Sequence, residues 1–230
     1  MLDIPIVPKV DGESTRYWVY KCLLENIINL NLPPGMPLGE QETSDCLGVS
    51  RTPLRDALFQ LAQEQFITII PQSKTFVSKI RLDLVEEARY IRRCVEMDIM
   101  RKLAKTFDDE HLLTLKYNLN RQELAHRKHN SELVYALDKE LHYTLFEIAG
   151  MAAIWDGVRK QQLHFQRMRN LYHTRNKDTF HVLSQHQELI AALEKRDFRL
   201  AEEIIDKHLS PEGWDISLML GEFPDYVDAN

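Results

Sequence analysis

The spacing of apolar residues in the first third of the chain predicts helices followed by a β-hairpin. Apolar residues recur at helical intervals over residues 15–31 and 41–47, and again from about Thr52. Residues 66–70 and 75–80 are rich in β-branched and apolar side chains and flank a turn, as the strands of a hairpin do. This order of elements predicts a winged helix-turn-helix domain over residues 1–81, which begins with an extended arm.

Helical periodicity dominates the remaining residues, 82–230. Prolines are absent from Asp83 until Pro211, and no segment shows the alternation typical of a strand. We expect a short helix after Pro211 and six longer ones over residues 83–105, 109–128, 131–149, 151–174, 179–195 and 197–209. The predicted fold class is mainly α, with an N-terminal winged helix-turn-helix domain and a C-terminal all-α helical bundle large enough to enclose a ligand.

The third predicted helix has the features of a DNA-recognition helix. Gly48 permits a tight turn before it, and Ser50 or Thr52 can cap its first N–H groups. Its core-facing residues would be Leu54, Ala57, Leu58 and Leu61. Arg51 and Arg55 are then left to contact phosphates or guanine edges in the major groove. The alternative is a capped amphipathic helix with ordinary solvated arginines.

Composition and charge argue against a nucleic-acid-coating protein, a membrane protein and a secreted protein. Of the 230 residues, 44% are hydrophobic and 28% charged, and the net charge of −6 argues against indiscriminate coating of nucleic acid. Between residues 51 and 81, however, five cations stand against Asp56 and Glu64. No apolar run is long enough to span a bilayer and no signal peptide is evident, so we expect a cytoplasmic protein without a membrane partner. The cysteines, Cys22, Cys46 and Cys94, are expected to be buried thiols.

Four polar residues of the predicted bundle stand where apolar side chains are expected. Asp138 and His142 are four residues apart beside an apolar stripe, while His186 and His208 lie on the apolar faces of two later helices. A carboxylate and three imidazoles are costly to bury unless something pairs with them. A divalent transition metal would do so, with zinc first and nickel, manganese or iron(II) also suited. A hydrogen-bonded core histidine is the more common explanation for any single one of them. The other histidines are expected to be solvated or capping residues: His111, His126, His129, His164, His173 and His181.

Two segments carry a resemblance to a known family. GVSRTPLRDAL, preceded by LPPGMPLGEQETSDCL, resembles the signature of the GntR superfamily of bacterial transcription regulators. The later helices resemble the FCD-type ligand-binding domain of its FadR-like group. The residues that carry this second likeness are Arg92 with Glu96, Asp138 with His142, His186 in HQELIAAL, and the segment DFRLAEEIIDKH that ends at His208. The chain departs from the family pattern at Gln65 and Phe66, where a Gly-Leu pair is usual.

The resemblance implies a function and its site residues. Members hold a metal in the bundle, respond to an effector that is usually a small carboxylate, and bind operator DNA as dimers. For this chain it implies a palindromic operator read by a homodimer. The implied DNA contacts are Ser50, Arg51, Thr52, Arg55 and Lys74; the implied metal ligands are Asp138, His142, His186 and His208; the implied counter-charges of the effector are Arg92, Arg167 and Arg169.

Two other functions remain open from the sequence. A metal held by three histidines and one aspartate could activate water in a helical-bundle metalloenzyme. No HExxH glutamate adjoins the ligands, however, and no further inward carboxylate or histidine is evident as a general base, which argues against an enzyme. The metal could instead be purely structural, stabilising the bundle without a part in any response to an effector.

Overall fold

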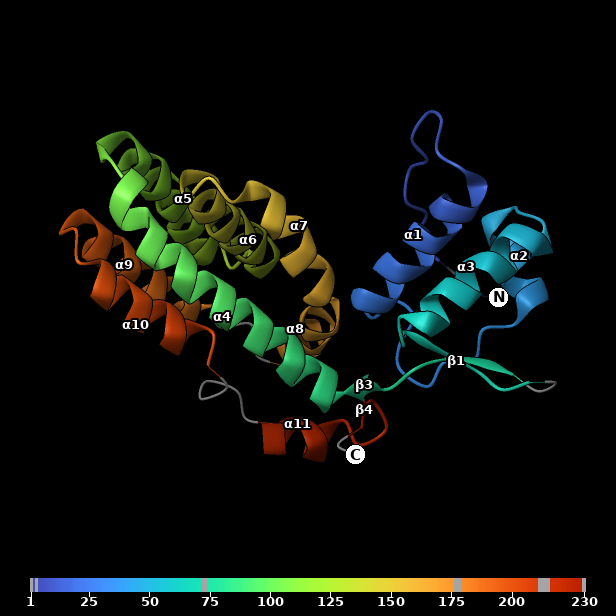
Figure 1. Ribbon diagram of the computed structural model, residues 1–230. Coiled ribbons are helices and arrows are strands. Elements are labelled where there is room, and N and C mark those ends of the chain that lie inside the picture. The colour runs from blue at the N-terminus through green and yellow to red at the C-terminus, as the bar shows by residue number, and fades with distance from the viewer. Residues whose placement is uncertain (1, 3, 72–73, 176–178, 211–215, 229–230) are drawn as a thin grey trace. The chain divides into compact units, whose positions relative to one another are not determined.

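The computed structural model describes residues 2, 4–71, 74–175, 179–210 and 216–228 (Figure 1). The chain divides into two compact units. One consists of Met1–Val85, His164–Tyr172 and Ile216–Asn230, and the other of Glu86–Leu163 and His173–Asp215. The predicted domain boundary between residues 81 and 82 stays a prediction. No helix in the described part of the chain combines the length and apolarity that crossing a bilayer requires.

The helix-turn-helix forms as predicted. Helices α1 (Thr15–Ile28) and α2 (Glu40–Leu47) pack against α3 (Arg51–Gln63). Gly48 ends α2 with a φ of 66°, a left-handed conformation that glycine adopts at little cost. The buried residues of α3 are those expected, Leu54, Ala57, Leu58 and Leu61. Ser50 occupies the N-cap position of α3, but its side chain makes no capping hydrogen bond.

The wing is an antiparallel hairpin with shorter strands than expected. β1 (Ile67–Ile69) pairs with β2 (Thr75–Val77), with Thr68 opposite Phe76. Gln65 precedes this hairpin with a φ of 63°. The family that the sequence resembles usually has glycine at this position, and the left-handed conformation costs a non-glycine residue about 1–2 kcal/mol. The side chain of Gln65 has a partner, since its Oε1 accepts a hydrogen bond from Nη1 of Arg81 at 2.6 Å.

A second, parallel strand pair joins distant parts of the sequence. β3 (Ile80–Arg81) pairs with β4 (Val227–Asp228), and the backbone N–H of Ile80 donates to the carbonyl oxygen of Tyr226 at 2.8 Å. Helix α11 (Ile216–Glu222) comes before β4. The expectation that no strand follows residue 83 is therefore wrong, because two residues are too few to show an alternating pattern.

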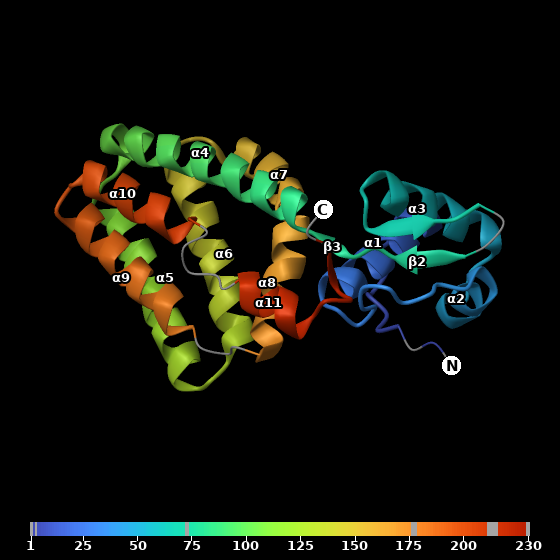
Figure 2. The same cartoon turned by 90° about the horizontal axis from the view of Figure 1, so that it is seen from below.

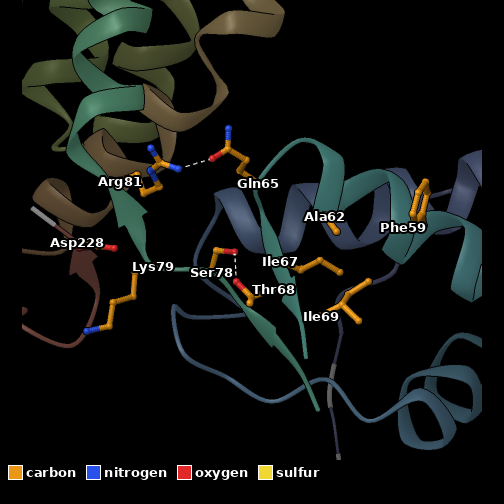
Figure 3. A pocket seen from close by; sticks show the side chains of 10 residues that line it. All are labelled: Phe59, Ala62, Gln65, Ile67, Thr68, Ile69, Ser78, Lys79, Arg81 and Asp228. Carbon is orange, nitrogen blue, oxygen red and sulfur yellow. Dashed lines mark hydrogen bonds between the residues drawn. The ribbon is translucent and has the colours of Figure 1, made fainter. Parts of the chain in front are cut away.

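A hollow of about 650 Å³ lies beside the hairpin in the same unit (Figure 3). Phe59 and Ala62 of α3 and Ile69 of β1 line its apolar part, while Lys79 and Asp228 belong to its polar part. The residues predicted to bind DNA, metal or effector are not among those that line it.

The bundle is built from long helices. They are α4 (Leu82–Thr106), α5 (Asp109–Arg127), α6 (Ser131–Ile148), α7 (Ala152–Gln161), α8 (Leu163–Arg175), α9 (Phe180–Glu194) and α10 (Phe198–His208). Helix α5 packs against α6 and α9, and α9 packs against α10 (Figure 2). Ion pairs from Arg93 to Asp206 and from Arg101 to Glu202 hold α4 beside α10. The mainly α fold class is confirmed.

Three further expectations are wrong. The helix predicted over residues 151–174 is two helices, which meet at Gln162, a buried residue whose Nε2 donates to the carbonyl oxygen of Ala88 at 2.5 Å. His164 is not solvated, because its ring stacks on Phe66 with centroids 4.2 Å apart and its Nε2 is 3.0 Å from the carbonyl oxygen of Glu64. Cys94 is exposed and Cys46 half-buried, and Cys22 is the buried thiol.

Candidate functional site

Four potential metal ligands from three helices meet inside the bundle. Asp138 and His142 are one turn apart on α6, His186 is on α9 and His208 ends α10. One ligand atom of each lies within 4.8 Å of all the others, and the Nε2 atoms of His142 and His208 are 3.2 Å apart. Oδ1 of Asp138 is 3.4 Å from Nε2 of His142, 3.4 Å from Nε2 of His186 and 3.6 Å from Nε2 of His208. Neighbouring ligands about 2.1 Å from a tetrahedral zinc ion lie roughly 3.4 Å apart, so these spacings fit one ion.

The second ring nitrogen of each histidine faces a side-chain oxygen. The pairs are Nδ1 of His142 with Oε2 of Glu96 at 2.5 Å, Nδ1 of His186 with Oε1 of Gln122 at 2.7 Å, and Nδ1 of His208 with Oε1 of Gln185 at 2.8 Å. Because these oxygens accept hydrogen bonds, each Nδ1 is assigned the hydrogen, and a neutral ring then turns its Nε2 lone pair toward the other ligands. Nε2 of His186 has no hydrogen-bond partner among the described residues. A cation would satisfy this convergence of electron-pair donors.

A chain of hydrogen bonds fixes which end of the Gln122 amide faces His186. The backbone carbonyl of Leu137 accepts from Nδ2 of Asn118 at 3.1 Å, and Oδ1 of Asn118 accepts from Nε2 of Gln122 at 2.7 Å. A carbonyl oxygen cannot donate, so the direction of the whole chain is set. Oε1 of Gln122 is thereby left to accept the hydrogen from His186.

The electrostatics of the cluster favour a bound cation. Burial raises the pKa of Asp138, but its close contacts with the three histidine rings outweigh this and hold that pKa well below its usual value. Burial lowers the pKa of His208 to about 3 and also lowers that of His186, so both rings are neutral at pH 7. Burial opposes protonation of His142 as well, but the charge of Glu96 outweighs it and the pKa of His142 is raised. One carboxylate with imidazole nitrogens is a donor set that zinc and its neighbours in the first transition row bind.

The three arginines predicted to bind the effector have different surroundings. Arg92 is buried on α4, where its Nε donates to Oε1 of Glu96 at 2.6 Å and its Nη2 has no described hydrogen-bond partner. Arg167 on α8 is fully buried, none of its guanidinium nitrogens has a described partner, and burial lowers its pKa to about 10. Arg169 is half-buried on the same helix. Arg92 belongs to one compact unit and the other two arginines to the other, so the three are not brought together within one unit.

The residues predicted to bind DNA are all exposed. Ser50, Arg51, Thr52 and Arg55 lie at the start of α3, and Lys74 lies between β1 and β2. Side chains of α2 contact both arginines: Oε2 of Glu40 is 2.8 Å from Nη2 of Arg55, and Oε1 of Gln41 accepts from Nη2 of Arg51. Helix α2 therefore orients the two guanidinium groups on an accessible surface.

Sequence reasoning missed the residues behind the histidines. Glu96 resembles a family position, but the sequence does not indicate its contact with His142, and nothing local marks Gln122 or Gln185 as the partner of a histidine. A signal was present on α5, where Asn118 and Gln122 are buried polar residues one turn apart beside Leu115 and Leu119. Buried amides on an otherwise apolar helix face require partners, which points to a polar interior nearby.

Two families match the chain. Residues 16–77 match the family described as bacterial regulatory proteins, gntR family, and residues 87–211 match the FCD domain. The chain is 30% identical over 191 residues to the HTH-type transcriptional repressor RspR of Escherichia coli K12, covering 83% of this chain and 84% of that protein. It is also 30% identical over 217 residues to the Uncharacterized HTH-type transcriptional regulator in unstable DNA locus of Streptomyces ambofaciens, covering 94% of this chain and 91% of that one.

The fold also matches a solved structure, that of E. coli McbR/YncC. The two share 18% sequence identity with a TM-score of 0.68, over 92% of this chain and 99% of the other. At this identity the likeness establishes the fold, a helix-turn-helix domain followed by a helical domain.

Proposed function

Because the chain belongs to the GntR family of bacterial transcription regulators and carries an FCD domain, we propose that it is a metal-containing regulator that binds palindromic operator DNA as a homodimer and responds to a small carboxylate. Its relatives are transcription regulators, so a metalloenzyme is not favoured. The observation that carries the proposal is the convergence of Asp138 with three histidine Nε2 atoms. Arg92 stands near them with an unused donor.

The DNA contacts are assigned to the start of α3 and to the wing. Arg51 and Arg55 would enter the major groove, where arginine pairs with guanine edges or phosphates. Ser50, Thr52 and Lys74 would contact the backbone around them. Two copies related by a twofold axis would place their α3 helices in half-sites about 34–36 Å apart, which is why the operator is proposed to be a palindrome.

The metal ligands are assigned to Asp138, His142, His186 and His208. Zinc is the first choice because it binds imidazole and carboxylate at this spacing, and nickel, manganese and iron(II) accept the same donors. A bound divalent metal would supply a Lewis-acidic position for an oxygen ligand. With Asp138 as its anionic ligand, the centre would keep a net positive charge that suits an anionic effector.

The carboxylate of the effector is assigned first to Arg92. A carboxylate and a guanidinium form two parallel charge-assisted hydrogen bonds, and Arg92 has a buried Nη2 without a described partner. Glu96 holds the Nε side of the same guanidinium, so the group is fixed before a ligand arrives. Arg167 and Arg169 belong to the other compact unit, and they stay predictions as further counter-charges.

A purely structural metal is the second candidate. It is favoured by the burial of the ligands, since Asp138, His142 and His186 are each no more than 3% exposed. In that case the metal would raise the melting temperature, but no carboxylate would add to its effect.

Thermal melts of metal-loaded protein with a panel of small mono-, di- and tricarboxylates separate the two candidates. We expect at least one carboxylate to raise the Tm, since a ligand at 100 times its Kd stabilises by about 2.7 kcal/mol. Arg92→Gln should abolish the shift. The matched control is Arg101→Gln on the same helix, because Arg101 is exposed and pairs with Glu202. A full shift in Arg92→Gln, or no shift with any carboxylate, would refute the effector assignment.

A further inference from the structure

The oxygens that hold the three Nδ1 atoms differ in charge. His142 has a carboxylate partner, Glu96, at 2.5 Å, whereas His186 and His208 have amide partners at 2.7 and 2.8 Å. An ionised acceptor forms a stronger hydrogen bond than a neutral one and makes the imidazole a better electron-pair donor to a metal. The three histidines should therefore not contribute equally to metal affinity.

We propose that Glu96 is the main positioning residue of the metal centre, acting through His142, and that Gln122 and Gln185 do the same more weakly for His186 and His208. The inference rests on the proposed function, since it concerns the same metal. Glu96 would not contact the metal itself, but it would control how tightly the metal binds.

Glu96 is fixed from both sides. It is 1% exposed, its Oε1 accepts from Nε of Arg92 at 2.6 Å, and its Oε2 accepts from Nδ1 of His142. Burial alone would favour the neutral acid, but the guanidinium group of Arg92 beside it favours the carboxylate. A Glu96→Gln substitution would weaken the hydrogen bond to Nδ1 of His142. It would also leave the buried guanidinium of Arg92, which lies near the proposed metal, without its counter-ion.

Gln185 offers a test in the opposite direction. Its Oε1 faces His208, and its Nε2 is buried without a described hydrogen-bond partner. Gln185→Glu would therefore supply His208 with a carboxylate and break no described hydrogen bond. Gln122 is not suitable for this exchange, because its Nε2 donates to Oδ1 of Asn118 and a carboxylate there would place two acceptors against each other.

The test is the Zn²⁺ affinity of the full-length protein, measured by competition with a chromophoric chelator at neutral pH. We expect Glu96→Gln to bind Zn²⁺ about 10–100-fold more weakly and Gln185→Glu to bind it about tenfold more tightly. Matched controls make the same two exchanges at exposed positions. Glu140→Gln on α6 and Gln161→Glu at the end of α7 change exposed residues, and both should keep the wild-type affinity.

The outcomes distinguish positioning from a merely structural role. If Glu96 only holds Arg92 in place, Glu96→Gln lowers the stability of the metal-free protein and leaves the Zn²⁺ affinity within about twofold, which overturns the proposal. Unchanged or weaker binding in Gln185→Glu also overturns it, and this variant decides alone if Glu96→Gln does not fold by circular dichroism. A wild-type chain that binds no Zn²⁺ refutes the proposed function itself, together with this inference.

Discussion

Replacing Asp138 with asparagine keeps the shape of the side chain and removes its charge. Asp138 is 3% exposed, and its Oδ1 lies 3.4–3.6 Å from the Nε2 atoms of the three histidines. The amide oxygen has no charge to set against a cation, so it is a poor substitute as a ligand. We expect a loss of metal affinity of about 100-fold, the upper end of what removal of an outer hydrogen-bond partner costs.

This loss converts into a difference in thermal stability. At a free zinc concentration 100 times the wild-type Kd, binding stabilises the wild-type protein by about 2.7 kcal/mol. A variant with 100-fold weaker binding is half-saturated at that concentration and gains only about 0.4 kcal/mol. For a chain of this size the difference of about 2.3 kcal/mol corresponds to roughly 5–9 °C in Tm.

The assay is differential scanning calorimetry of each protein after chelation and again with zinc. Asp98→Asn is the matched control, because Asp98 is an exposed residue of α4 that lies 3.6 Å from Nζ of Lys102. Its zinc-induced rise in Tm should equal that of the wild type. An equal rise in Asp138→Asn would show that Asp138 is not a ligand and would refute the reasoning.

Three further outcomes are expected at other positions. Arg55→Ala should weaken operator binding by about 1–3 kcal/mol and flatten its salt dependence in fluorescence anisotropy, and unchanged affinity would remove Arg55 from the interface. Leu193→Ala, in the fully buried core, should lower the free energy of unfolding in urea by about 2–5 kcal/mol, and a negligible loss would contradict its packing. Burial lowers the pKa of His164 in the folded protein below that in the unfolded chain. As the pH falls below the ordinary histidine pKa, the unfolded chain therefore binds the proton before the folded protein does, and the free energy of unfolding decreases. His164→Gln should lose less stability than the wild type on acidification, and an identical loss would contradict this.

Periodicity predicts the long helices well and the short tertiary features poorly. Helices α5 and α6 end within one residue of the predicted limits, because their sequences are amphipathic and the Asp108 and Asn130 side chains cap their first turns. At the break between α7 and α8, Gln162 donates a hydrogen bond to the carbonyl oxygen of Ala88, 74 residues earlier in the chain. The strand at residues 227–228 likewise exists through its pairing with Ile80. Such features follow from contacts between segments and leave no local pattern.

In the candidate site, the sequence likewise predicts the ligands but not the residues that contact them. Asp138, His142, His186 and His208 could be selected from the sequence because each interrupts or borders an apolar helix face, and the structure brings them together. The hydrogen bond from His142 to Glu96 spans 46 residues and depends on how α4 and α6 pack, so spacing along the chain could not reveal it. The expectation for His164 failed for the same reason, since its burial depends on Phe66.

The most direct test of the proposed metal centre is anomalous diffraction from crystals of the zinc-loaded protein, collected on both sides of the zinc absorption edge. We predict one anomalous peak per chain about 2.0–2.2 Å from a carboxylate oxygen of Asp138 and from Nε2 of His142, His186 and His208. A map with no peak among these four residues, or with zinc bound only at surface histidines, would contradict the account.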